Sequence, residues 1–73
     1  MQKHDLAVLP CFYEALQQTI TKEQLPVFAF IKNMIVRANG SVLYQVRLLY
    51  SGCVNIDKLI ELAQQKALGE YGE

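Results

Sequence analysis

The residues best suited to nucleophilic or metal chemistry are one histidine, His4, and two cysteines, Cys11 and Cys53. Catalysis by a serine or cysteine nucleophile needs a base beside the nucleophile. The single imidazole lies near the N-terminus, where chains are commonly mobile, so such a pairing is not expected. A tetrahedral zinc site takes four ligands, and these three residues provide neither the number nor a paired spacing. The sequence therefore predicts no catalytic centre and no metal site.

Glycines and carboxylates are the next residues to consider for ligand binding and catalysis. A phosphate-binding loop needs clustered glycines, but the glycines of this chain are isolated from one another at Gly40, Gly52, Gly69 and Gly72. Acid–base catalysis commonly uses paired carboxylates, whereas those of this chain are scattered and expected on solvated surfaces: Glu14, Glu23, Asp57 and Glu61. We expect a protein that is not an enzyme and that binds no cofactor.

The length and charge of the chain narrow the function further. Its 73 residues fit one domain, residues 1–73, because two hydrophobic cores need a longer chain. Seven basic and seven acidic residues give a formal net charge of zero. This balance creates no long-range field toward nucleic acid or an anionic membrane, so nucleic-acid binding is not favoured, and it does not oppose self-association.

Two further features bear on location. Residues 1–12 lack the pattern of a signal peptide, and Lys32 and Arg37 interrupt the most apolar run before it reaches the roughly 20 residues of a membrane span. We expect a cytoplasmic protein without a membrane segment. In that compartment Cys11 and Cys53 are expected to be reduced, buried thiols that form no disulfide.

The two ends of the chain have the periodicity of helices. Apolar residues recur every three or four positions between Asp5 and Ile20, which predicts an amphipathic helix that begins near Pro10 or is kinked there. A second helix is predicted over residues 56–68, with Asn55 as its N-cap and Gly69 at its end. Residues 70–73 then form a polar tail.

The middle of the chain supports two interpretations. Asn39-Gly40 between apolar segments favours a hairpin with a two-residue type I′ turn, and the alternation of residues 42–50 is typical of a strand. This gives an α+β domain, helix–β-hairpin–helix. The alternative is an all-α bundle of three or four short helices, in which Thr21 and Gln24 form a capping box. A two-residue turn has one cost for the hairpin, since it places Lys32 opposite Arg47.

The hairpin has more apolar surface than two helices can cover. If the helices pack on the face that carries Ile31, Ile35 and the alternate residues from Val42 to Tyr50, the other face stays uncovered. We expect this second face to be a protein interface, formed by Phe28, Phe30, Met34, Val36, Leu43 and Leu49. The predicted function is a noncatalytic protein–protein interaction module, a homodimer or the binder of another protein. The alternative is a small dimeric DNA-binding transcriptional regulator.

Overall fold

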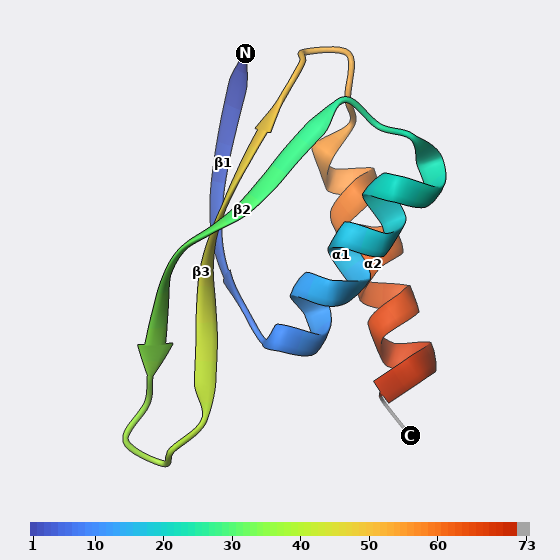
Figure 1. Cartoon of the computed structure of the whole chain (residues 1–73). Coiled ribbons are helices and arrows are strands. Elements are labelled where there is room, and N and C mark those ends of the chain that lie inside the picture. The colour runs from blue at the N-terminus through green and yellow to red at the C-terminus, as the bar shows by residue number, and fades with distance from the viewer. Residues whose placement is uncertain (72–73) are drawn as a thin grey trace.

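The computed structural model describes residues 1–71 and shows a three-stranded sheet with two helices on one side (Figure 1). The elements are β1 (Gln2–Val8), α1 (Pro10–Glu23), β2 (Val27–Val36), β3 (Val42–Tyr50) and α2 (Ile56–Tyr71). Strand β3 lies between β1 and β2 and is antiparallel to both, which is a split β-α-β arrangement. The predicted α+β class is confirmed, and the all-α alternative is wrong.

The N-terminal segment differs from the prediction, because residues 2–8 form a strand where a helix from Asp5 was expected. His4, Leu6 and Val8 alternate along β1 and lie opposite Leu48, Val46 and Tyr44 of β3. Proline fits the first turn of a helix, where its missing N–H is not needed, and α1 accordingly begins at Pro10. The helical spacing of the N-terminal apolar residues was therefore coincidental, and tertiary pairing with β3 decides the structure.

The ends of the helices confirm one predicted cap and correct two others. The backbone N–H of Lys58 donates a hydrogen bond of 3.1 Å to Asn55 Oδ1, so Asn55 caps α2. Helix α2 continues through Gly69, which does not end it, so Glu70 and Tyr71 belong to the helix and not to the tail predicted at 70–73; residues 72–73 lie outside the described residues. At the other helix, Gln24 ends α1 in the left-handed region (φ 53°) and does not take part in a capping box.

The β2–β3 hairpin closes through a different turn from the one predicted. Gly40 has φ +85°, but no positive φ is found at Asn39, so this is not a type I′ turn. The Arg37 N–H donates to the Ser41 carbonyl at 2.8 Å, and the Gly40 N–H donates to the Arg37 carbonyl at 2.9 Å. The loop therefore has three residues with a left-handed glycine, and the first strand pair after it is Val36 with Val42.

The core lies between the sheet and the helices. Leu16 of α1, Val46 and Leu48 of β3, and Leu59 of α2 are its largest fully buried side chains. The alternate β3 residues predicted to face the core do so, because Val46 and Leu48 have no exposed surface. Tyr44 extends this core along β3 by an edge-to-face contact with Tyr13 of α1, with ring centroids 5.7 Å apart.

Candidate binding surface

A β-bulge in β2 decides which side chains share a face of the sheet. Ile31 lies opposite Val46, but the next paired residue is Asn33, opposite Gln45, so Lys32 is the extra residue. Side chains of directly opposed residues point to the same side of a sheet. The β2 residues after Lys32 are therefore shifted by one position relative to an uninterrupted strand. Ile35 consequently lies on the same face as Phe28 and Phe30, whereas Met34 and Val36 lie on the opposite face.

The structure does not bring the six predicted interface residues together on one face. Phe28, Phe30, Leu43 and Leu49 share the side of the sheet that the helices leave bare. Met34 and Val36 lie opposite Tyr44 and Val42 and so belong to the helix side. Ile35, which was predicted to join the core, instead lies opposite Leu43 on the bare side. The two reasons are the bulge at Lys32 and the three-residue turn, neither of which the alternating pattern indicates.

We call the bare side of the sheet the outer face. It consists of Lys3, Asp5 and Ala7 of β1, Phe28, Phe30, Asn33 and Ile35 of β2, and Leu43, Gln45, Arg47 and Leu49 of β3. Phe28 and Phe30 are 68% and 42% exposed, while Leu43 and Leu49 are half-buried. The most accessible apolar groups of the outer face are therefore the two phenylalanine rings of β2.

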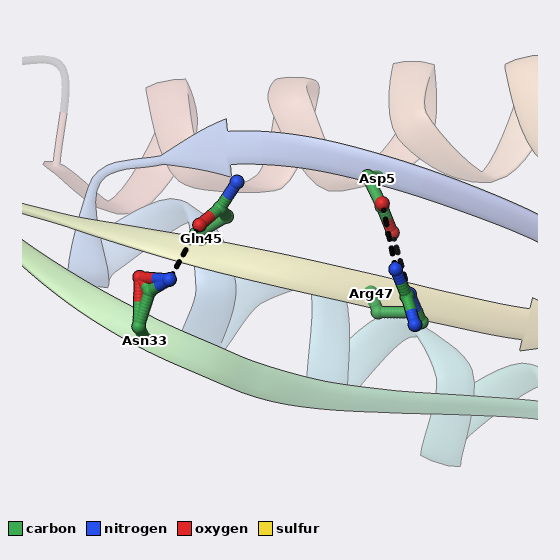
Figure 2. Close-up of polar contacts among 4 residues, drawn as sticks. All are labelled: Asp5, Asn33, Gln45 and Arg47. Atoms are coloured by element: carbon green, nitrogen blue, oxygen red, sulfur yellow. Dashed lines mark hydrogen bonds and ion pairs between the residues drawn. The ribbon is translucent and has the colours of Figure 1, made fainter.

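An ion pair crosses the middle of the outer face. Arg47 donates two hydrogen bonds to Asp5, from Nε to Oδ1 at 2.9 Å and from a terminal nitrogen to Oδ2 at 3.1 Å (Figure 2). This bond to Arg47, with the charges of Arg47, Lys32 and Lys3, holds the pKa of the Asp5 carboxyl below its usual value. The expected clash between Lys32 and Arg47 does not occur, because Phe30 lies opposite Arg47.

Next to the ion pair, two amide side chains are joined across β2 and β3. Asn33 Nδ2 donates to Gln45 Oε1 at 2.6 Å (Figure 2). One hydrogen bond uses only part of what two amides offer, since each carries a carbonyl oxygen and two N–H donors. Asn33 is exposed and Gln45 is half-buried. The outer face thus presents amide donors and acceptors beside its charged pair and its aromatic rings.

Charge is distributed unevenly between the two layers, although the chain as a whole is neutral. The strands and the hairpin turn, residues 1–8 and 27–50, carry four basic residues and one acidic residue. The remaining segments of the described chain, residues 9–26 and 51–71, carry three basic and five acidic residues. Of the sheet cations, Arg47, Lys32 and Lys3 lie close enough to Asp5 to act on its carboxyl, and that carboxyl is already bonded to Arg47. With Lys32, whose charge acts on Asp5 from the bulge, the outer face therefore has three basic residues, Lys3, Lys32 and Arg47, against the one carboxylate of Asp5.

A second exposed apolar patch lies on the helix side of the hairpin. The helices stop short of the hairpin end (Figure 1). On this side of β2, from its middle toward the turn, Ile31, Met34 and Val36 are 39%, 58% and 69% exposed. We call these three residues the underside patch. None of them is charged, and neither are their partners on β3, Val46, Tyr44 and Val42. The patch is therefore apolar throughout, unlike the outer face.

The residues first considered for chemistry are dispersed in the structure. His4 lies in β1 and is half-buried, so it does not belong to a mobile terminus. Both cysteines are free; Cys11 is half-buried, whereas Cys53 is exposed, contrary to the expected burial, with its sulfur 2.9 Å from Ser51 Oγ. Within residues 1–71, no three His, Cys, Asp or Glu side chains gather in a way that could hold a metal ion.

The scattered carboxylates and the membrane prediction are also addressed by the structure. Carboxylates predicted on solvated surfaces are exposed, as expected, at Glu14, Glu23, Asp57 and Glu61. Among the described residues, neither helix is long and apolar enough to cross a bilayer.

Comparison of the chain with protein-family models, curated proteins and solved structures finds no match.

Proposed function

We propose that this chain is a noncatalytic interaction module that pairs with a second copy of itself through the underside patch. The observation that carries the proposal is the exposure of Ile31, Met34 and Val36 on the side of the sheet that elsewhere forms the core. These side chains lie on the core-facing side of the sheet but beyond the helices that cover the core. A partner that covers them removes their apolar surface from water, which is favourable.

Charge favours a second copy at the underside patch over a second copy at the outer face. Pairing two identical patches brings the same set of groups from each copy together around a twofold axis. At the outer face this would bring two sets of Lys3, Lys32 and Arg47 together, each offset by a single carboxylate that is already bonded. The underside patch has no charged side chain to repel its copy.

The strand edges favour the same choice. The free edge of β2 contains the bulge at Lys32, which interrupts the regular row of backbone donors and acceptors that edge-to-edge pairing requires. The free edge of β1 carries charged side chains at Lys3 and Asp5. Face contact through the underside patch avoids both edges. Because three side chains form a small contact, we expect a weak dimer with a dissociation constant in the micromolar range.

The test is sedimentation equilibrium of the wild type and two matched variants. Met34→Asp places a carboxylate in the underside patch, and Phe28→Asp places the same group at a similarly exposed position of β2 on the outer face. We expect a concentration-dependent dimer for the wild type and for Phe28→Asp, and a monomer for Met34→Asp. A wild type that stays monomeric at millimolar concentration, or a dimer that survives Met34→Asp, contradicts the proposal.

A further inference from the structure

We infer that the outer face is a binding site for single-stranded nucleic acid. The inference goes beyond self-pairing and is independent of it, because the underside patch lies on the opposite side of the sheet. It rests on three kinds of group that the fold places on one uncovered surface: exposed aromatic rings, cations and amides.

The aromatic rings are suited to stacking. Phe28 and Phe30 are two residues apart on β2, so their side chains emerge from the same face about 7 Å from each other. Neither is needed for the core, since both point away from the helices and are 68% and 42% exposed. Unpaired bases stack on such rings whatever their sequence, and each stack contributes enough to change affinity about fivefold or more.

The cations lie beside the rings. Lys32 occupies the bulge two residues along β2 from Phe30, and Lys3 shares a row with Leu49 and Phe28. Arg47 lies directly opposite Phe30 but is paired with Asp5, so the net positive charge beside the rings comes from the two lysines. Phosphate contacts of this kind supply most of the affinity for a nucleic-acid strand. The zero net charge of the chain is therefore a poor guide here, because the acidic residues are concentrated outside the sheet.

The amides complete the surface. Gln45 and Asn33 are hydrogen-bonded to each other at 2.6 Å and lie beside the charged pair, on its turn side (Figure 2). Their remaining donors and acceptors are of the kind that bond the edges of unpaired bases. Amides, rings and cations together fit a strand with bases splayed on the sheet better than they fit an acidic peptide, because Asp and Glu side chains have no aromatic ring to stack on Phe28 and Phe30.

A single strand is favoured over a duplex by the shape of the surface. Recognition of duplex DNA commonly inserts a helix into the major groove. Both helices here lie behind the sheet, and the exposed residues of α2 include Asp57 and Glu61, which repel phosphate. The uncovered sheet therefore offers its rings to bases that are already unstacked.

The experiment is a fluorescence-anisotropy titration of labelled single-stranded RNA and DNA of mixed sequence, about 12 nucleotides long, at about 50 mM salt. We expect saturable binding that Phe28→Ala/Phe30→Ala weakens tenfold or more. Leu68→Ala, at a comparably exposed apolar position on α2 outside the sheet, should leave the affinity unchanged. Lys32→Gln should reduce the slope of log K against log salt by about 0.7, the value for one phosphate contact on a single strand.

Several results would overturn the inference. They are the absence of binding at low salt, equal affinities for the double phenylalanine variant and the wild type, tighter binding of a duplex of the same length, and displacement of the RNA by oligoglutamate at equal charge concentration. Backbone NMR spectra of the wild type give a second readout that needs no variant. Added RNA should shift the amide signals of β2 and β3 around Phe30 and Arg47, and shifts confined to the helices would contradict the assignment.

Discussion

Truncation of Leu48 should destabilise the fold far more than truncation of its neighbour Leu49. Leu48 has no exposed surface and lies in the central strand between His4 of β1 and Ala29 of β2. Leu49 is half-buried on the outer face. The two positions therefore compare opposite faces of one strand with the same substitution.

The expected magnitudes follow from burial. Leu48→Ala removes a fully buried side chain and leaves a cavity, at a cost of about 2–5 kcal/mol. A domain of this length has a free energy of unfolding of about 4–11 kcal/mol, so this single change removes a large part of it. Leu49→Ala loses only partial burial and should cost about 1 kcal/mol or less.

Urea denaturation followed by circular dichroism measures both costs. A lower midpoint at an unchanged slope gives the loss of stability directly. Equal losses for the two variants, or a larger loss for Leu49→Ala, would refute the assignment of Leu48 to the core side of β3 and Leu49 to the bare side. The outer face and the underside patch are both defined from that assignment. An unfolded Leu48→Ala variant beside a folded Leu49→Ala variant agrees with the expectation.

Three further predictions concern the cap, the glycines and the ion pair. Asn55→Ala removes the acceptor for the Lys58 N–H and should lower the free energy of unfolding by about 0.5–2 kcal/mol in the same urea assay, with Gln64→Ala, an exposed amide in the middle of the same helix, as the control. Gly40→Ala should lower the free energy of unfolding by about 1–2 kcal/mol because its φ is +85°, whereas Gly69→Ala, in helix α2, should raise it by up to about 1 kcal/mol. Changes of the same sign in the two variants would contradict a left-handed Gly40 and a helical Gly69. Because the pKa of Asp5 is lowered in the folded state, its contribution to stability is present above the unfolded pKa and is lost as pH falls through the folded pKa, so the melting temperature of the wild type should fall more than that of Asp5→Asn on acidification from about pH 5 to pH 2.

The elements that local signals specify could be predicted from the sequence. Strand β3 alternates without interruption, and Asn55 places the start of α2, so both were predicted where they occur. Strand β1 could not be predicted in the same way. Its apolar residues also fit helical spacing, and its strand conformation depends on pairing with residues about forty positions away. That pairing is a property of the tertiary fold.

The candidate surface was predicted only in part, for a related reason. Four of the six proposed interface residues share the outer face, but the side on which Met34 and Val36 lie depends on the bulge at Lys32 and on the turn at Gly40. Each of these adds one residue to the hairpin, and a shift of one residue moves a side chain to the opposite face. The same difference in register explains why Phe30 lies opposite Arg47, where the two-residue turn predicted Lys32.

The unequal lengths of the strands have a consequence for motion. Strand β1 ends at Val8, opposite Tyr44, so the hairpin beyond that point is a two-stranded ribbon without a third strand or a helix beneath it. Segments with so few buried contacts open on their own, at a much smaller free-energy cost than global unfolding. Amide protons near Val36 and Val42 should consequently exchange with solvent while those of Val46 and Leu48 remain protected, and a ligand that orders the ribbon would slow its exchange first.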